Sequence, residues 1–321
     1  MRKMSKTINV GIIGAGIVGE RVIKALQKHE RGNILGVFDV NEERSKYICG
    51  QYHLEAVKDY KELLNNQEID VVYLAVPPKY HHSIALEIIK ANKHIICEKP
   101  LANSISEAKE MLEAAEKQGV VHAMNFPTVY TPAFKRMKAL LDEGFLGTTR
   151  RIELKAYFPQ WPRPWQQTDW IGSREQGGFV REVFTHFVQM IGMVLGEIVD
   201  IDTNIEYPED SLACETGIIA TAALKNGTPI LFNGFSDVAI QESLALTLYG
   251  TEGTISMENW RELWTSSKGE ARKRLELEET DHLLELIDEV FKAIEKKEAS
   301  IITFEAGYHA QIVIEELLAR Q

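Results

Sequence analysis

A glycine-rich segment near the start of the chain lies between a short apolar run and a stretch with helical periodicity. Its residues are Gly14, Ala15, Gly16, Ile17, Val18 and Gly19. The apolar run is Ile8–Ile13 and the helix-like stretch is Gly19–His29. Glycines at these spacings permit a tight turn and a close approach between a strand and the following helix. The segment therefore predicts the first strand–turn–helix unit of a parallel α/β domain.

Short apolar runs and helix-periodic stretches go on alternating as far as Asn125. The runs are rich in Val and Ile and nearly continuous in apolar character, as strands buried on both faces of a parallel sheet must be. The expected strands are Ile8–Ile13, Ile34–Phe38, Val71–Val76, His94–Cys97 and Val121–Met124. The expected helices include Gly19–His29, Ser83–Ala91 and Ser106–Gln118. This order predicts a domain with a doubly wound parallel sheet over residues 1–125.

The pattern changes after Asn125. A helix is expected over Ala133–Glu143, and the segments beyond it alternate in polarity as antiparallel strands do. These expected strands are Arg150–Phe158, Ser211–Leu224, Thr228–Phe235 and Ser243–Gly250, with Asn226-Gly227 as a hairpin turn. We therefore expect a second, α+β domain over residues 126–321, built on an open, mostly antiparallel sheet. The terminal helix, about Gly307–Arg320, is compatible with packing on either domain.

Length and charge exclude several classes of protein. A chain of 321 residues usually forms more than one domain. The formal net charge of −11 argues against binding to nucleic acid, which requires clustered Lys and Arg. No apolar run is long enough to span a membrane, and Met1–Lys6 leads into a strand without a secretory signal. Cys49, Cys97 and Cys214 are scattered and odd in number, which does not suit a disulfide framework, so we expect a cytoplasmic protein. They have no metal-type spacing, so we expect no metal site.

An acidic residue follows the second expected strand, where dinucleotide-binding units carry one. Asp39 can accept hydrogen bonds from the adenosine ribose and would repel a 2′-phosphate, which favours NAD over NADP. Arg44 is near enough to meet a 2′-phosphate, so NADP stays open. The cofactor-binding residues predicted from this motif are Gly14, Gly16, Ile17, Val18, Gly19, Asp39 and Arg44.

A lysine follows the fourth expected strand in the sequence Glu98-Lys99-Pro100. The proline restricts Lys99 to extended geometry, so the lysine is presented at the carboxyl edge of the sheet, where open α/β folds bind ligands. An isolated Lys-Pro pair is more often a surface turn. After a buried strand and a nucleotide fingerprint, a catalytic lysine is the favoured interpretation.

A largely apolar helix is expected over Phe179–Leu195, after Gly177-Gly178. Glu182, His186 and Gln189 form one polar stripe along it. Polar groups on a buried helix cost free energy unless they are paired or face a cavity. A paired His and Glu in the core is one interpretation. A functional site is the other, with His186 transferring a proton and Glu182 orienting it or a substrate hydroxyl.

The segment 161–170 holds three tryptophans and an arginine in a proline-broken loop. Aromatic planes with polar edges suit the face of a sugar, and they equally suit a subunit interface. The candidate substrate contacts are Arg163, Trp165, Arg174 and Arg181. The cationic ones would suit a carboxylate or phosphate on the substrate.

Over essentially its whole length, the chain resembles the Gfo/Idh/MocA family, which includes glucose-fructose oxidoreductase and inositol dehydrogenase. The motifs that carry the resemblance are Gly14–Gly19, Val76–His81, Ala91–Ala102 and Gly177–His186. The resemblance implies an N-terminal Rossmann domain, a C-terminal α/β domain with an open sheet, and a nicotinamide cofactor. It implies sugars, polyols and related cyclic alcohols or ketones as substrates, and self-association as a homodimer or homotetramer.

The resemblance also implies residue roles. Lys99 resembles the family's active-site lysine and His186 its catalytic histidine, with Pro100 in a cis peptide. The positions that match cofactor contacts are Val76, Pro77, His81, Glu98 and Lys99. The family commonly has an aspartate four residues before the histidine, where this chain has Glu182, and that departure leaves the substrate open.

The leading prediction is an NAD(P)-dependent oxidoreductase that transfers hydride between nicotinamide and a secondary alcohol or ketone of a sugar-like substrate. Lys99 would stabilise the developing alkoxide, and His186 or Lys99 itself would carry the proton. Two alternatives stay open: a regulator that senses NAD(P) without catalysis, and an NAD-dependent glycosidase of the same fold.

Overall fold

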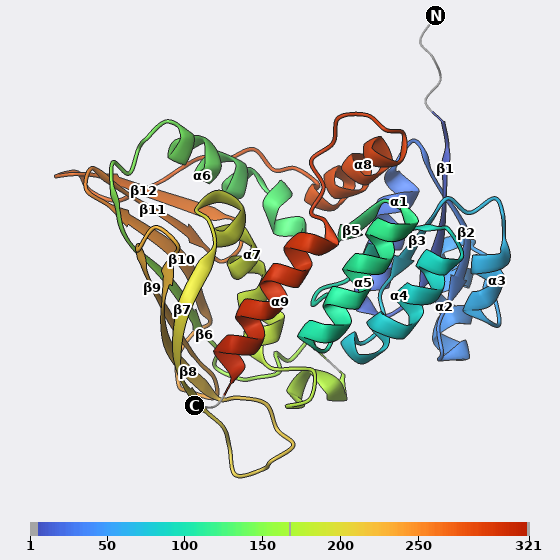
Figure 1. Cartoon of the computed structure of the whole chain (residues 1–321), viewed down its shortest axis with the longest axis horizontal. Coiled ribbons are helices and arrows are strands. Elements are labelled where there is room, and N and C mark those ends of the chain that lie inside the picture. Colours follow the sequence, from blue (N-terminus) through green and yellow to red (C-terminus); the bar gives the residue numbers. More distant parts are fainter. Residues whose placement is uncertain (1–5, 167, 320–321) are drawn as a thin grey trace, which may run out of the picture. The chain divides into compact units, whose positions relative to one another are not determined.

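The computed structural model describes residues 6–166 and 168–319, which form two compact units. The first unit takes in the chain as far as Pro127, together with Asp281–Tyr308. The second unit takes in Thr128–Thr280 and the chain from His309 onward. Gln167, within the tryptophan-rich segment, and Arg320, at the expected end of the terminal helix, lie outside the described residues. Each unit is built on one sheet (Figure 1).

The first unit has a five-stranded parallel sheet in the order β2-β1-β3-β4-β5. Its strands are β1 Ile8–Ile13, β2 Gly32–Phe38, β3 Val71–Leu74, β4 His94–Cys97 and β5 His122–Met124. A parallel bridge between Val37 and Ala56 continues the sheet beyond β2. The strand order reverses between β1 and β3, which is the switch point where ligands bind in such sheets. The predicted doubly wound parallel sheet is confirmed.

Helices flank this sheet, and all four residues of β3 are buried, as the continuous apolar runs predict. The helices before residue 128 are α1 Ile17–Lys28, α2 Glu42–Tyr52, α3 Tyr60–Asn65, α4 His81–Lys90 and α5 Ile105–Gln118, with a short 3₁₀ turn over Pro78–Tyr80 and another that begins at Pro127 and ends at Tyr130. A further helix, α8 His282–Ile294, joins the unit from far along the chain and contacts α1.

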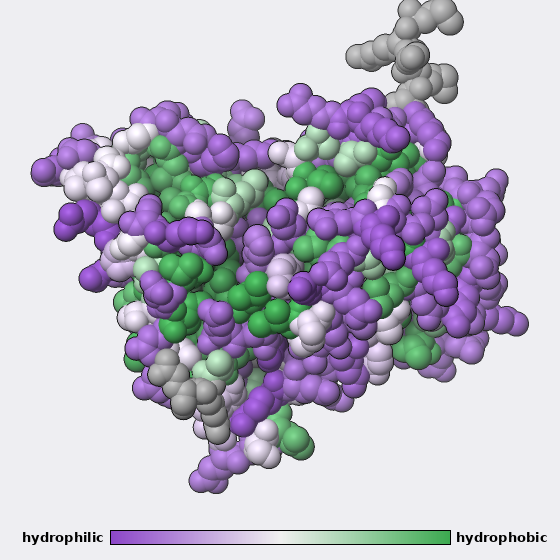
Figure 2. Space-filling model, in the orientation of Figure 1, coloured by the Kyte–Doolittle hydropathy of each residue, from purple (hydrophilic) through white to green (hydrophobic). Residues whose placement is uncertain are grey.

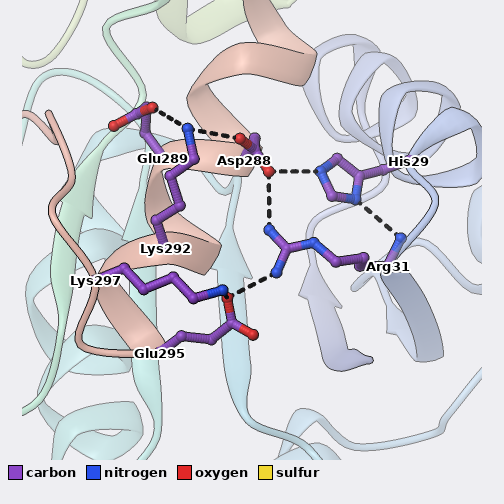
Figure 3. A network of polar contacts seen from close by, with 7 residues as sticks. All are labelled: His29, Arg31, Asp288, Glu289, Lys292, Glu295 and Lys297. Carbon is purple, nitrogen blue, oxygen red and sulfur yellow. Dashed lines mark hydrogen bonds and ion pairs between the residues drawn. The ribbon is translucent and has the colours of Figure 1, made fainter. Parts of the chain in front are cut away.

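A network of charged groups holds α8 to the turn between α1 and β2 (Figure 3). Arg31 pairs with Asp288 and with Glu295, each at 2.8 Å. His29 lies 3.6 Å from the same Asp288, and burial lowers the pKa of this imidazole. The Arg31 side chain is only 13% exposed, so its charge depends on these partners.

The second unit has an eight-stranded sheet in the order β13-β12-β11-β10-β6-β9-β8-β7. Its strands are β6 Thr149–Tyr157, β7 Ile198–Glu206, β8 Gly217–Leu224, β9 Pro229–Phe235, β10 Ser243–Gly250, β11 Gly253–Glu258, β12 Glu262–Ser267 and β13 Lys273–Arg274. Neighbouring strands are antiparallel except for β6 and β9, which are parallel. The predicted open, mostly antiparallel sheet is confirmed.

The largest difference from the expected strands is in β8. The segment Ser211–Leu224 was predicted as a single strand, but β8 begins only at Gly217. The residues before it instead pair with the loop around Gly172, because Cys214 N–H donates to the Gly172 carbonyl at 2.9 Å. Arg174 N–H likewise donates to the Leu212 carbonyl at 2.8 Å.

The expected helix over Phe179–Leu195 is present but irregular. It opens as a π-helix over Val180–Phe184 and continues as α7 over Thr185–Val194. The other helices of this unit are α6 Pro132–Asp142, a 3₁₀ turn over Asp169–Gly172, and part of α9 Phe304–Leu318, whose first residues belong to the first unit. Single-turn π segments inside α-helices often occur at functional sites.

Hydrophilic residues cover much of the face that Figure 2 presents, in agreement with a charged content of 26%. Every helix in the described part of the chain is too short or too polar to cross a membrane.

Candidate functional site

The glycine-rich turn lies at the switch point between β1 and β3. Gly14 N–H donates to the Phe38 carbonyl at the end of β2, at 2.8 Å. Gly14 has φ +101°, and a Cβ atom there would lie 2.2 Å from the Ala75 carbonyl oxygen. Only glycine adopts this conformation readily at so close an approach. Gly14 therefore brings the turn after β1 against the segment after β3.

The N-terminus of α1 fits an anionic group. A Cβ on Gly19 would lie 2.0 Å from the Gly14 carbonyl oxygen, so this glycine lets the helix begin directly against the turn. Gly16 is the N-cap, and among the described side chains none caps it. A Cβ on Gly16 would meet nothing within 4 Å, and Ile17 and Val18 are exposed. Uncapped N–H groups and the helix dipole at an open surface suit a pyrophosphate.

Asp39 and Arg44 both hold this turn. Asp39 accepts hydrogen bonds from Ala15 N–H at 2.7 Å and from Asn41 N–H at 2.9 Å. Arg44 Nε donates to the Ala15 carbonyl at 2.8 Å, and its guanidinium pairs with Glu20 at 2.7 Å. A hydrogen bond from Lys24, with others from Tyr52 and Arg44, lowers the pKa of Glu20 to about 2. The Arg44 charge therefore has an ionised carboxylate beside it at neutral pH.

His81 joins the segments that follow β3 and β4. Its ring is fully buried, with Nδ1 2.9 Å from the Pro100 carbonyl oxygen and Nε2 2.8 Å from that of Val76. Burial lowers the pKa of His81, and a neutral imidazole donates from one nitrogen. The Lys99–Pro100 peptide is cis. His81 therefore ties the backbone next to Lys99 to the Val76–Pro77 turn.

A second cluster anchors Glu98. The Tyr73 hydroxyl donates a hydrogen bond to the Glu98 carboxylate. Asn125 Nδ2 donates to Tyr73 Oη at 2.8 Å and to Glu98 Oε1 at 2.5 Å. Burial raises the pKa of Tyr73, which keeps this donor protonated. These three residues come from the ends of three adjacent strands, and they fix the backbone on which Lys99 stands.

Sequence reasoning missed Tyr73 and Asn125 in this cluster. The available signal was Tyr73 itself, which brings a hydroxyl into a strand whose other residues are aliphatic. A buried tyrosine hydroxyl usually finds a hydrogen-bond partner.

In the second unit, Glu182 lies on the π-helix and His186 on the first turn of α7. His186 Nδ1 is 3.4 Å from Thr128 Oγ1. The rings of Trp260 and His186 meet edge to face, with centroids 5.4 Å apart and planes at 86°. Trp260 also packs on Phe187, with ring centroids 5.2 Å apart. Trp260 was not predicted from the sequence.

Two of the four candidate substrate contacts are in ion pairs. Arg163 is 8% exposed and binds Glu242 through Nε, at 3.0 Å, and through a terminal nitrogen, at 2.9 Å. Arg181 pairs with Glu315 at 3.0 Å. Bidentate Arg–carboxylate pairs are among the stronger charge-assisted contacts. Both guanidinium charges are therefore compensated inside the second unit.

The other two candidates differ in exposure. Arg174 lies over the Tyr207 ring at 3.9 Å and donates from Nε to the Ala213 carbonyl at 3.0 Å. Trp165 is 51% exposed. An open pocket of about 610 Å³ lies beside them, lined by residues that include Arg163, Pro164, Thr168, Asp169 and Leu212. Among the described residues, no group of three or more His, Cys, Asp and Glu side chains could hold a metal ion.

Two family models match the chain. Residues 8–126 match the NAD-binding Rossmann fold of the Gfo/Idh/MocA oxidoreductase family. Residues 134–256 match the C-terminal domain of the same family.

Individual relatives agree with these matches. An uncharacterized oxidoreductase, YrbE, from Bacillus subtilis is 26% identical over 80% of this chain and 76% of its own length. Myo-inositol 2-dehydrogenase from Thermotoga maritima is 24% identical over 79% of this chain and 76% of its own. The solved structure of levoglucosan dehydrogenase with NADH and levoglucosan has a TM-score of 0.87 and 19% identity, covering 98% of this chain and 96% of the other. The similarity to levoglucosan dehydrogenase, at 19% identity, shows a shared fold and no more.

The family models cover most of the chain, and they cover the glycine turn, the segment around Lys99 and the helix with His186. The fold and the geometry of the glycine turn agree with them. The chain belongs to the Gfo/Idh/MocA family of oxidoreductases, and its first unit is an NAD-binding Rossmann domain.

Proposed function

We propose that this protein is an NAD-dependent dehydrogenase or reductase that interconverts a secondary alcohol and a ketone on an uncharged sugar or polyol. The observation that carries the proposal lies within the first unit. The glycine turn after β1 and Lys99 after β4 stand at the same carboxyl edge of one parallel sheet. Bound NAD would supply the hydride acceptor or donor.

The residues that would hold NAD are those of the glycine turn together with Asp39. The first-turn N–H groups of α1 would bind the pyrophosphate. Asp39 uses one lone pair on each oxygen toward the backbone and keeps others for the adenosine ribose hydroxyls. Its negative charge disfavours a 2′-phosphate, and Arg44 is already beside Glu20. We infer that NAD is preferred over NADP.

The chemistry on the substrate oxygen belongs to Lys99 and His186. For oxidation, the Lys99 ammonium donates a hydrogen bond to that oxygen and stabilises the negative charge that develops, while His186 accepts the hydroxyl proton. For reduction, the two roles reverse. Glu182, four residues before His186 on the same helix, would orient His186 or a substrate hydroxyl.

The arginines favour an uncharged substrate. Arg163 and Arg181 have carboxylate partners, and Arg174 is held by Tyr207 and by a backbone carbonyl. Binding a substrate phosphate or carboxylate there would require breaking these contacts, at a cost of a few kcal/mol for a buried pair. Inositol and levoglucosan, named for two similar proteins, are uncharged polyols. Self-association and a cytoplasmic location remain predictions.

A turnover assay tests the proposal. Purified protein is mixed with NAD or NADP and a panel of inositols, sugars, anhydrosugars, sugar acids and sugar phosphates, and reduced nicotinamide is followed by absorbance. We expect turnover with NAD and an uncharged member of the panel. Turnover confined to sugar acids or phosphates would contradict the substrate class. Tight NAD binding without turnover on any member would favour the regulator instead.

Two lysine variants then test the site. Replacing Lys99 with Met should lower kcat by about 100-fold or more, the scale expected for loss of a group that stabilises a developing oxyanion. Lys90→Met, an exposed lysine at the end of α4, is the matched control and should stay within about twofold. An undiminished rate in Lys99→Met would contradict the assignment.

A further inference from the structure

Glu215 is a buried carboxyl group that the proposed chemistry does not use. It lies in the loop before β8 and is 2% exposed. Its Oε1 accepts a hydrogen bond from Val180 N–H at 2.7 Å. Val180 is the first residue of the π-helix. The carboxyl group therefore binds one of the N–H groups that a helix N-terminus leaves without an intrahelical partner.

The two glycines before this helix make room for that contact. A Cβ on Gly178, at φ +98°, would lie 2.2 Å from Glu215 Oε2. A Cβ on Gly177 would lie 2.3 Å from the carbonyl oxygens of Trp170 and Ile171. The Gly177-Gly178 pair in the sequence is thus explained by packing of the second unit, with Glu215 filling the place of a side chain at Gly178.

The loop that carries Glu215 is held independently. Cys214 N–H and Thr216 N–H, on either side of it, each donate to a backbone carbonyl at 2.9 Å. The backbone N–H groups of Val180 and of Glu215 itself and the charges of Arg181 and Arg174 favour the ionised carboxylate. The neighbouring thiol of Cys214 has a pKa that is raised by burial and by the charge of Glu215. Burial outweighs these contacts and raises the pKa of Glu215 to about 7. Either protonation state keeps an oxygen that accepts from Val180.

We propose that Glu215 is a positioning residue that sets the start of the helix carrying Glu182 and His186. The inference rests on the proposed function, because it assigns His186 to the reaction. Val180 precedes Glu182 by two residues and His186 by six, so a shift at the start of the π-helix passes directly to both. Misplacement of a catalytic group by about 1 Å can lower a rate by about 100-fold.

Two substitutions at Glu215 separate positioning from charge. Glu215→Gln keeps the shape and the accepting oxygen, whereas Glu215→Leu leaves Val180 N–H without its partner. With the best substrate from the panel, we expect Glu215→Leu to lower kcat by about 10- to 100-fold and Glu215→Gln to stay within about threefold. The Kd for NADH, read from its fluorescence, should stay within about twofold in both, which shows that the first unit remains folded. An unchanged kcat in Glu215→Leu, or an equal loss in Glu215→Gln, would overturn the proposal.

Two further measurements distinguish positioning from general damage. In a His186→Ala background, Glu215→Leu should cause little additional loss, because residues that act as one unit are not additive. A second full loss in that background would contradict the proposal. The imidazole resonance of His186, assigned with His186→Ala, should change its shift and titration in Glu215→Leu and recover in Glu215→Gln. An unchanged resonance would also overturn it. If His186→Ala itself is fully active, the proposed function fails, and the resonance still tests Glu215.

Discussion

Trp260 shows how a single residue can be held against the His186 ring despite an unfavourable backbone conformation. Asn259 and Trp260 have φ values of +47° and +72°, in the turn between β11 and β12. Left-handed conformations are uncommon for bulky residues and cost about 1 kcal/mol or more. Here the cost is offset by contacts of the indole ring with His186 and Phe187. Strained residues of this kind often cluster at functional sites.

We predict that Trp260→Gly lowers kcat/KM by about 10-fold while changing stability little, because relief of backbone strain offsets part of the lost packing. Trp260→Phe should stay within about threefold, since it keeps an aromatic edge. Trp264→Phe, in the neighbouring strand, is the control for loss of an indole. The measurement is kcat/KM against pH together with thermal denaturation. Full activity in Trp260→Gly would show that the contact with His186 has no role.

At the scale of elements, α8 illustrates a helix that belongs to a unit far from its place in the chain. Asp288 in α8 and Glu295, the residue that caps its end, meet Arg31 across 257 and 264 positions of sequence. Figure 3 shows Arg31 reaching both Asp288 and Glu295, with Lys292 and Lys297 at the rim of the cluster. Removing one partner of a half-buried ion pair lowers the free energy of unfolding more than removing one partner of an exposed pair. The burial of each charged group therefore decides how much its substitution destabilises the unit.

Arg31→Met should therefore lower the free energy of unfolding of the first unit by about 2 kcal/mol, between the values for surface and buried pairs. Lys297→Met is the matched control, since Lys297 is 57% exposed and pairs with the same Glu295. It should cost no more than about 0.5 kcal/mol. Urea denaturation followed by circular dichroism measures both. Equal losses in the two variants would show that burial does not govern the network.

At the scale of the whole molecule, the five tryptophans offer a selective probe of stability. All lie between residues 161 and 264, in the second unit, so intrinsic fluorescence reports on that unit. Glu215 belongs to the same unit, and burial raises its pKa from 4.5 to about 7. The folded state thus disfavours the ionised carboxylate of Glu215. The neutral form stabilises the fold relative to the ionised form, and this stabilisation is lost as the pH rises through about 7.

Between about pH 5 and pH 8, the free energy of unfolding of wild type should therefore fall by about 2 to 3 kcal/mol relative to Glu215→Gln, which cannot ionise. Urea midpoints from tryptophan fluorescence, taken for both proteins at the two pH values, measure this difference. If the free energy of unfolding of wild type minus that of Glu215→Gln stays constant or rises from pH 5 to pH 8, the raised pKa is contradicted.

The sequence alone determined most of the first unit and the identity of its cofactor site. Continuous apolar runs indicate strands buried on both faces, so the local pattern was sufficient to predict the parallel sheet. The glycine after β1 could be predicted as well, and the close approach of Ala75 explains why a glycine is needed there. Pattern also indicated Lys99 and His186. It placed Glu182 on a regular helix, whereas the helix opens as a π-helix, since such an insertion leaves no trace in apolar periodicity.

Only the tertiary structure decided which distant groups support these residues. Glu215 meets Val180 across 35 positions, Asn125 meets Tyr73 across 52, and Arg163 meets Glu242 across 79. Hydrogen bonds and ion pairs of this kind are set by how strands and loops pack, and no period of 2 or 3.6 residues encodes them. The glycine turn could therefore be predicted from local sequence, and the catalytic roles of Lys99 and His186 stay predictions from the same source, while the long-range contacts depend on the fold.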